Sequence, residues 1–129
     1  MKEIKIRSTK REELIDITKK VEEQIKDIKE GIVFLYVPHA TAGITINENY
    51  DPNVNDDILE FFKKLIPQGK WKHDKVDNNA DAHIKSSIIG VSQTIPIKNG
   101  KLMLGRWQSV SLCEFDGPRE RTIILKTVE

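Results

Sequence analysis

The sequence predicts an α+β fold: a single domain of mostly antiparallel sheets in a sandwich-like arrangement, with about three helices. Three observations predict it. Strand-like segments lie at both ends of the chain, helical patterns fill the middle, and no regular strand–helix rhythm indicates a parallel sheet. Strands grouped in this way around the helices are typical of the α+β class.

Length and composition limit what the protein can be. The 129 residues suffice for one compact domain, so residues 1–129 are taken as a single unit, and a (β/α)₈ barrel of about 250 residues is excluded. The only cysteine is Cys113, which excludes an internal disulfide and suits a reducing compartment. No apolar run approaches the ~20 residues of a membrane span, and the N-terminus lacks a signal-peptide core. We therefore expect a cytoplasmic protein with no membrane partner, and the net charge of +1 argues against a nucleic acid partner.

The first third of the chain predicts strands around one helix. Residues 4–6 alternate apolar and polar side chains as a strand does, and residues 14–17 form either a strand or the entrance to a helix. A helix is expected over residues 18–30, closed by Gly31. Its apolar stripe consists of Val21, Ile25 and Ile28. Residues 32–37 are almost all apolar, which predicts a buried central strand.

The middle of the chain predicts another strand and a long helix. Residues 43–47 alternate again and should form the strand. Asp51 and Pro52 are a strong helix start, with the aspartate as N-cap and the proline as first helical residue. Pro67 and Gly69 end this helix. Its apolar face consists of Val54, Ile58, Phe61, Phe62 and Leu65.

A third helix is expected next, and the last third of the chain predicts strands. Asn78 is the predicted N-cap of the helix, Asp81 is a weak capping-box partner, and Gly90 ends it. The residues expected on one face are Ala80, Ile84, Ser87 and Ile88. The strands are expected over residues 91–97, 102–104, 107–115 and 122–128, with turns at 98–100 and 116–118.

The three histidines occupy polar, non-periodic positions near the ends of elements. His39 follows the buried strand in a run of small residues, His73 lies in a polar loop, and His83 lies early in the third helix. Three neutral imidazoles around an open fourth position are typical of a catalytic zinc centre, and related sets suit manganese, iron, nickel or cobalt. The carboxylates placed to orient the rings are Asp74, Asp77 and Asp81.

Two other interpretations of the histidines stay open. General acid–base catalysis would pair His39 with Thr41, or His83 with Asp81. In the simplest interpretation, each histidine is a surface or hydrogen-bonded residue that binds no ligand.

Basic side chains near turns suggest an anionic ligand. These side chains are Lys85, Arg106, Arg119 and Arg121. Guanidinium groups beside turns bind phosphate well. The alternative is that Arg119 and Arg121 pair with Asp116 and Glu120 as ordinary charges of an edge strand. No glycine-rich nucleotide-binding loop is present.

Two further residues are interpreted mainly as packing residues. Cys113 lies within an alternating strand, which favours a buried thiol over a nucleophile. Trp107 at a strand start favours the core or a subunit interface, and stacking on a planar ring is the alternative.

Four motifs occur in a fixed order along the chain. They are HATAGITINE at 39–48, DNNADAHIK at 77–85, LGRWQ at 104–108 and EFDGPR at 114–119. A chain with these motifs resembles the YjbQ-like family, which is often labelled secondary thiamine-phosphate synthase. The resemblance covers nearly the whole chain, and four ordered motifs are far more specific than any one of them.

The resemblance implies a fold of paired sheets, a homotrimer with sites near subunit boundaries, and a metal-associated histidine cluster. On this chain the cluster would be His39, His73 and His83. The expected cofactor is a divalent metal, with zinc as first choice and magnesium where a diphosphate is bound. The residues assigned to catalysis are His39, His83, Thr41, Glu48 and Lys85. Those assigned to substrate binding are Asn79, Gln108 and Arg119.

The activity that the resemblance implies is a transferase reaction on a phosphorylated small molecule. It joins a pyrimidine diphosphate to a thiazole phosphate and releases diphosphate. Departure of diphosphate calls for positive charge, which Lys85, Arg119 or a divalent metal would supply. Two alternatives stay open: a metal-dependent hydrolase or lyase of another phosphorylated metabolite, and a non-catalytic trimeric metal-binding protein. Three histidines with no cysteine nearby favour an open coordination position, as in an enzyme.

Overall fold

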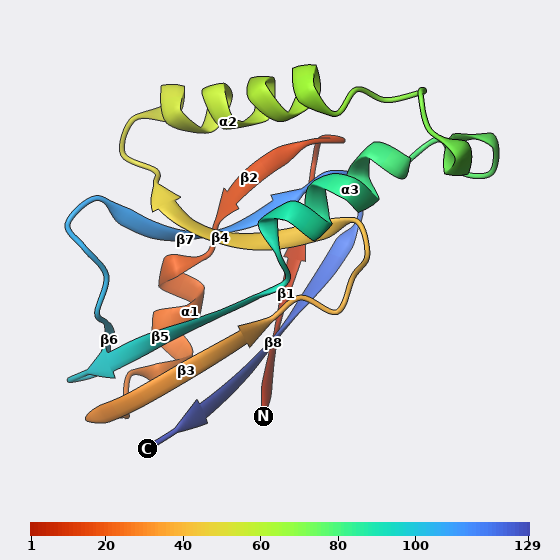
Figure 1. Ribbon diagram of the computed structural model, residues 1–129. Coiled ribbons are helices and arrows are strands. Elements are labelled where there is room, and N and C mark those ends of the chain that lie inside the picture. The colour runs from red at the N-terminus through yellow and green to blue at the C-terminus, as the bar shows by residue number, and fades with distance from the viewer.

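The computed structural model describes all 129 residues and has three α-helices, a short 3₁₀ helix and eight strands (Figure 1). In chain order the elements are β1 (Lys2–Arg7), β2 (Glu13–Asp16), α1 (Thr18–Ile25), β3 (Glu30–Tyr36), β4 (Ala42–Glu48), α2 (Pro52–Leu65), η1 (Lys72–Lys75), α3 (Ala80–Ile89), β5 (Ser92–Lys98), β6 (Lys101–Leu102), β7 (Gln108–Glu114) and β8 (Glu120–Val128). None of the helices combines the length and apolar character that a transmembrane segment requires.

The strands form two sheets whose neighbours all run antiparallel. The larger sheet has the order β1-β8-β3-β5-β6 and the smaller sheet has the order β2-β7-β4. The first and last strands pair along their length, with Lys2 opposite Leu125 and Arg7 opposite Glu120. The predicted α+β class, with antiparallel sheets and three helices, is therefore confirmed.

One hydrophobic core of 17 buried residues fills the space between the two sheets. Helix α1 contributes Val21 and Ile25, both completely buried. The strands contribute every second side chain, such as Val33 and Leu35 from β3 and Leu112 from β7. Burial of each large aliphatic side chain is worth about 1.5–3 kcal/mol, so this shared core holds the two sheets together.

Helix α1 is shorter than the sequence predicts. It ends at Ile25, and Ile28 lies in the turn that follows. The reason is the hairpin between β5 and β6, because the N–H groups of Asn99 and Gly100 donate to the carbonyl oxygens of Lys29 and Ile28. Asn99 and Gly100 have φ values of 51° and 73°, as a tight hairpin turn requires, which confirms the predicted turn.

The starts of α2 and α3 show one correct prediction and one wrong one. The Asp51 side chain accepts a hydrogen bond from the N–H of Asn53, as predicted for the N-cap of α2. Asn78 does not cap α3. The N-cap position is Asn79, whose side chain makes no capping hydrogen bond, and Asp74 Oδ1 accepts the N–H of Ala80 at 2.9 Å from six residues earlier in the chain.

Helices α2 and α3 lie over the outer face of the smaller sheet (Figure 1). Helix α3 does not bury the predicted face, because Ile84 is only partly buried and Ile88 is exposed. Small and charged side chains face inward instead, and small ones let the helix approach β4, where Gly43 lies against Ile89. The buried residues of α3 are Ala80, Asp81, Ala82, Lys85 and Ser86.

Helix α2 is attached to the body by few side chains. Phe62 is its one buried residue and contacts Phe115 on the smaller sheet, with ring centroids 6.2 Å apart. Phe61 and Leu65, which the sequence places on the same apolar face, are 60% and 58% exposed. The apolar face of this helix is therefore only partly covered within one chain.

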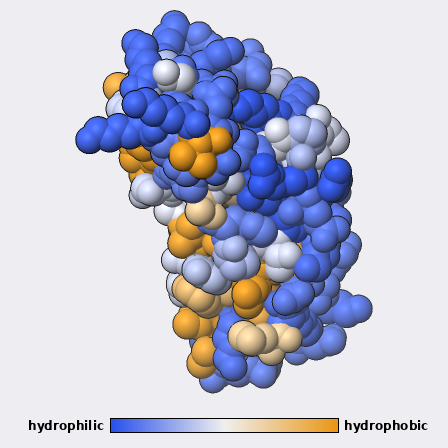
Figure 2. Space-filling view, turned by 90° about the vertical axis from the view of Figure 1, so that its right-hand side faces the viewer, coloured by the Kyte–Doolittle hydropathy of each residue, from blue (hydrophilic) through white to orange (hydrophobic).

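Apolar side chains also remain on the surface of the larger sheet. Strand β3 is central, as predicted, but it is buried on one face only. Its other face leaves Ile32, Phe34 and Tyr36 about 40% exposed. Figure 2 shows hydrophobic side chains gathered in patches among hydrophilic ones on one face of the molecule.

Candidate functional site

The predicted site residues fall into three groups. The first group lies where the β1–β2, β3–β4 and β7–β8 connections meet the start of α3. We call it the ion-pair end, and its predicted members are His39, Thr41, Asn79, Lys85 and Arg119. The second group is the histidine pair, His73 and His83. The third is the aromatic end, where Glu48 and Gln108 lie beside Tyr50 and Trp107.

A buried ion pair between Glu114 and Arg121 forms the centre of the ion-pair end. Glu114 is fully buried and Arg121 nearly so, and the guanidinium Nε donates to Glu114 Oε1 at 2.9 Å. The Nη2 group of Arg121 donates to the hydroxyl and the carbonyl of Thr41 at 2.9 and 3.2 Å. Burial alone would raise the pKa of Glu114, but hydrogen bonds from Arg121 and Ser8 bring that pKa below its ordinary value. The pair is therefore ionised and ties β7 of one sheet to β8 of the other.

The structure contradicts one interpretation of the basic residues, in which Arg121 would pair with Glu120 on an edge strand. Arg121 pairs with Glu114, not with Glu120, and β8 is an interior strand of its sheet. A local pattern in β7 indicates this pairing. Glu114 continues the inward-facing positions of Val110 and Leu112 in an alternating strand, and a charge at such a position indicates a buried partner.

His39 is held in a fixed orientation beside this ion pair. Its Nε2 accepts the backbone N–H of Thr122 at 2.9 Å. Burial and then the charge of Arg121 lower the pKa of His39 below its ordinary value, so the ring is neutral at pH 7. A neutral ring that accepts at Nε2 carries its proton on Nδ1. In this state His39 offers an N–H donor and has no free lone pair for a metal.

Asn79 and Arg119 meet at Asp116, in the turn between β7 and β8. Asn79 Nδ2 and Arg119 Nη2 donate to the same oxygen, Asp116 Oδ2, at 2.8 and 3.2 Å. The Arg119–Asp116 pair confirms the simpler interpretation of Arg119. Since Arg119 is half-exposed, part of its guanidinium stays open to solvent. The amide oxygen of Asn79 is buried and has no hydrogen-bond partner.

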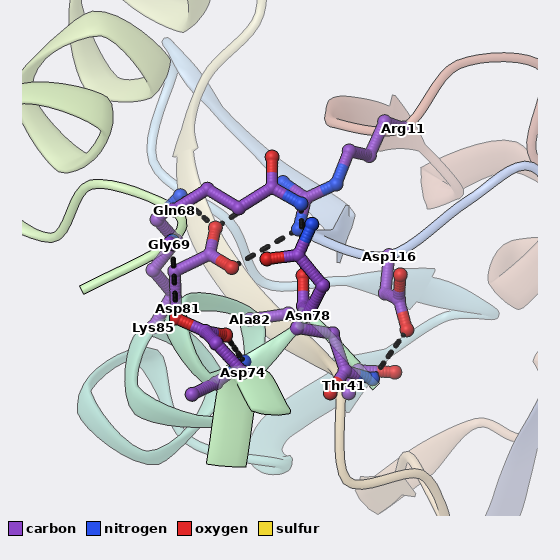
Figure 3. Close-up of polar contacts among 12 residues, drawn as sticks. Arg11, Thr41, Gln68, Gly69, Asp74, Asn78, Asp81, Ala82, Lys85 and Asp116 are labelled. Carbon is purple, nitrogen blue, oxygen red and sulfur yellow. Dashed lines mark hydrogen bonds and ion pairs between the residues drawn. The ribbon is translucent and has the colours of Figure 1, made fainter. Parts of the chain in front are cut away.

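Lys85 is paired with two acidic side chains, and Figure 3 shows it near Asp81 and Arg11. Its Nζ donates to Asp81 Oδ2 at 2.9 Å and to Glu12, and Arg11 forms two hydrogen bonds with Asp81 at 3.0 and 3.2 Å. Burial would raise the pKa of Asp81, but the hydrogen bonds from Arg11 and Lys85 lower it. Asp81 therefore serves this cluster and does not cap α3. The cluster borders a hollow of about 760 Å³ between α2 and α3.

The histidine pair lies at the other side of the start of α3. The rings of His73, from η1, and His83, from α3, meet edge to face with centroids 5.0 Å apart. They line a hollow of about 310 Å³ together with Trp71. His73 Nε2 lies 3.5 Å from Asp77 Oδ2, which fits the predicted role of that carboxylate in orienting a ring.

Asp74 fixes the loop that carries His73. Its carboxylate accepts the N–H groups of Gly69, Trp71 and Ala80 at 2.9–3.0 Å. The hydrogen bond from Trp71 is the main reason why the pKa of Asp74 is below its ordinary value. Asp74 thus acts on the backbone and positions His73 indirectly, whereas the sequence suggested direct contact with an imidazole.

The three histidines do not form one metal centre within a single chain. No group of three or more histidine, cysteine or acidic side chains is arranged to hold a metal ion. His39 is bound to Thr122, and His83 has only His73 as an imidazole neighbour. Two imidazoles fit part of a metal site, and further ligands would have to come from outside this chain.

Glu48 and Gln108 face each other across strands β4 and β7, far along the strands from Thr41. Gln108 Oε1 accepts the N–H of Gly105 at 2.8 Å, and Glu48 Oε2 accepts that of Asp51 at 3.3 Å. Sequence motifs indicated both residues, and the length of β4 separates Glu48 from Thr41 and the other residues of the ion-pair end.

Cys113 is excluded as a nucleophile. Its side chain is completely buried, and burial raises the pKa of the thiol to about 12. A thiol in this state is protonated and inaccessible, so the predicted packing role is confirmed.

Comparisons with known proteins decide the family. The family model described as UPF0047 protein YjbQ-like matches residues 2–129. The chain belongs to the YjbQ/UPF0047 family. Among relatives in this family, UPF0047 protein MJ1081 of Methanocaldococcus jannaschii is 52% identical over 125 residues, which cover 95% of this chain and 90% of the relative. UPF0047 protein YugU of Bacillus subtilis is 47% identical over 131 residues, 98% of this chain and 97% of the relative.

Solved structures of similar chains show the same fold. A crystal structure from Clostridium acetobutylicum has a TM-score of 0.94 at 44% identity and covers 99% of this chain and 100% of its own. The protein APE1520 from Aeropyrum pernix has a TM-score of 0.92 at 42% identity and covers 98% and 96%. These names state a family and no reaction, so the function is argued from the site.

Proposed function

We propose that this chain is a metal-dependent enzyme acting on a phosphorylated small molecule, with His73 and His83 as metal ligands. The observation that carries the proposal is the pair itself. Two imidazoles from separate elements meet at a hollow with centroids 5.0 Å apart, and His83 makes no side-chain hydrogen bond. Imidazole nitrogens left available in this way are the common ligands of zinc and related divalent ions.

The metal site requires more than one chain. A divalent ion such as zinc, once bound, would act as a Lewis acid toward a phosphoryl oxygen, and magnesium would serve where a diphosphate is bound. His73 and His83 supply two ligands, and the homotrimer expected from the resemblance would supply others from a neighbouring copy. In the same trimer, the aromatic end of one copy, with Glu48 and Gln108, would lie against the metal site of its neighbour.

The phosphate group of the substrate would bind at the ion-pair end. His39 presents Nδ1–H, and the half-exposed guanidinium of Arg119 has donors that Asp116 does not use. Burial, Arg121, Arg119 and Lys5 lower the pKa of His39 and Glu114 raises it, so three cations and one anion surround the ring. A cationic surrounding with two outward donors favours an anion.

Two residues assigned to catalysis are better placed as positioning residues. Lys85 has both acidic partners and is 1% exposed, so it holds Asp81 in place. The Thr41 hydroxyl accepts a hydrogen bond from Arg121 and secures the loop that carries His39. The reaction we propose is the one that the resemblance implies, the joining of a pyrimidine diphosphate to a thiazole phosphate with release of diphosphate.

Metal analysis tests the ligand assignment. We expect the purified protein to contain a divalent transition metal by elemental analysis, and His73→Ala and His83→Ala to lose it. Lys72→Ala, an exposed neighbour in η1, is the matched control and should retain the metal. His39→Ala should also retain the metal but bind inorganic phosphate more weakly. Full metal content in both His73→Ala and His83→Ala would overturn the assignment, and loss of metal in His39→Ala would restore the three-histidine centre.

Product analysis tests the reaction. The protein is incubated with the two thiamine precursors and, separately, with a panel of phosphate esters. Formation of the coupled product together with diphosphate, abolished in His83→Ala, would support the transferase reaction. Ester hydrolysis with the same dependence would favour the hydrolase alternative, and neither activity would favour the non-catalytic metal-binding protein.

A further inference from the structure

Two exposed aromatic side chains form a pair at the aromatic end of the smaller sheet. Tyr50, from the β4–α2 loop, is 80% exposed, and Trp107, just before β7, is 50% exposed. Their rings lie at 64° with centroids 5.2 Å apart. Neither ring belongs to a hydrophobic core cluster, so the core role predicted for Trp107 is wrong, and the alternative role at a subunit interface stays a prediction.

Polar hydrogen bonds hold the loops that carry the two rings. Asn49 Nδ2 donates to Asp16 Oδ2 at 2.9 Å, and Asn55 Nδ2 donates to Asn49 Oδ1 at 2.8 Å, which fixes the Tyr50 loop to α2 and to the β2–α1 junction. The turn before β7 is fixed by the bond from Gly105 to Gln108. The pair is therefore built into ordered loops, although its rings face solvent.

The two rings border a hollow of about 470 Å³ that also contains two carboxylates. Its lining consists of Glu48, Tyr50, Asp51, Pro52 and Trp107. Glu48 uses only Oε2, toward the N–H of Asp51, and Asp51 uses only Oδ1, as the cap of α2. Each carboxylate thus keeps one oxygen without a hydrogen bond. Two aromatic walls with negative charge beside them attract a cation.

A cation of the chain already lies on one of these rings. The Arg106 Cζ atom is 5.0 Å from the centroid of Trp107, and Arg106 forms no salt bridge. Arg106 does not line the hollow that contains Glu48 and Asp51. The position of Arg106 shows that Trp107 can take part in a cation–π interaction. It also puts a positive charge near the hollow, which would repel a second cation.

We propose that the hollow beside Tyr50 and Trp107 binds a quaternary or methylated ammonium ion. Such a cation has few or no N–H donors and a weakly hydrated surface, so aromatic faces and nearby charge hold it better than a full set of hydrogen-bond acceptors does. The hollow is lined by two aromatic rings, a proline and two carboxylates that each keep one oxygen without a hydrogen bond. The hollow contains neither histidine of the pair, so choline binding is measured on metal-free protein and its failure is distinguishable from failure of the metal assignment.

Direct binding tests the proposal. Choline is titrated against the protein while the shift and broadening of its N-methyl proton signal are followed by NMR. The neutral isostere 3,3-dimethyl-1-butanol has the same shape without the charge, and sodium chloride controls for ionic strength. We expect saturable binding with an upfield N-methyl shift for choline only. Equal binding of the neutral isostere, or no saturable binding of choline, would overturn the proposal.

Four variants locate the cation. Trp107→Leu and Tyr50→Leu should each weaken choline binding by about tenfold, since each removes an aromatic wall. Glu48→Gln should weaken it, whereas Glu60→Gln, an exposed carboxylate further along α2, is the matched control and should not. Arg106→Ala should strengthen binding, because it removes a competing positive charge. Wild-type affinity in both aromatic variants, or weaker binding in Arg106→Ala, would contradict this location. The replaced rings are exposed, so thermal unfolding should confirm that the fold is retained.

Discussion

The ion-pair end and the histidine pair lie on opposite sides of the start of α3 and use polar side chains in different ways. At the ion-pair end, Glu114, Arg121, Asp81 and Lys85 are buried and direct most of their donors and acceptors at one another. At the histidine pair, the side chains are partly exposed and make few bonds within the chain. The polar residues of the ion-pair end therefore stabilise the fold, and the two imidazoles of the histidine pair are available to a ligand.

The largest effect is expected from breaking the central ion pair. Arg121→Met leaves the Glu114 carboxylate buried without its partner, and we expect the free energy of unfolding to fall by about 3–5 kcal/mol. Arg119→Met removes a half-exposed pair with Asp116 and should cost less than about 1 kcal/mol. Chemical denaturation measures both. A loss in Arg121→Met no greater than in Arg119→Met would contradict the structural role of the buried pair.

A smaller loss is expected from the second buried cluster. Lys85→Met removes one partner of Asp81, but Arg11 still neutralises that carboxylate, so we expect a loss of about 2–3 kcal/mol. The matched control is Lys64→Met, whose exposed pair with Glu60 should contribute about 0.5 kcal/mol or less. If Lys85→Met is as stable as the control, Lys85 does not stabilise the fold, and the structural role assigned to the ion-pair end is contradicted.

The pH dependence of stability should distinguish His39 from the carboxylates. The pKa of His39 is lowered in the folded state, so the unfolded chain binds more protons as pH falls below about 6.5, and the fold loses stability there. The pKa values of Glu114 and Asp81 are also lowered, so their contribution is complete above their ordinary pKa values and is lost further into acid. Urea unfolding of wild type and His39→Gln between pH 7 and 5 should show a steeper loss in wild type. Identical slopes would contradict the assignment.

The smallest effect is expected at the histidine pair. His73→Ala and His83→Ala remove partly exposed rings outside the core, so without metal the free energy of unfolding should change by about 0.5 kcal/mol or less. Added zinc should raise the Tm of the wild type and not that of the variants, because binding to the folded state alone stabilises it. An equal rise in all three proteins would place the metal elsewhere.

Local signals in the sequence predicted much of the fold. Asp51 and Pro52 start α2, and Asn99 and Gly100 make the hairpin turn, because each preference acts within a few residues. The prediction of which face of α3 is buried was wrong. Its inward-facing Asp81 and Lys85 form ion pairs with Arg11 and Glu12, which lie some 70 residues earlier in the chain. The periodicity of side chains within the helix cannot predict partners that are so distant in the sequence.

The candidate site could be predicted only in part, for the same reason. The predicted cluster of three histidines places His73 beside His83, as the structure shows, but a 10-residue spacing through a loop does not determine where a ring lies. His39 looked equivalent to them in sequence, and only the hydrogen bond from Thr122 distinguishes it. The separation of Glu48 from Thr41 follows from their positions at opposite ends of β4, which a strand assignment alone could have shown.

The pairing of β1 with β8 has a practical consequence. The two ends of the chain leave the same sheet close together (Figure 1). Copies of the protein can therefore be fused in tandem through short flexible linkers. In such a fusion each copy can carry a different substitution. For example, one copy lacks His39 and the copy fused to it lacks His83. Metal content and activity of these chains would count how many copies contribute to one site.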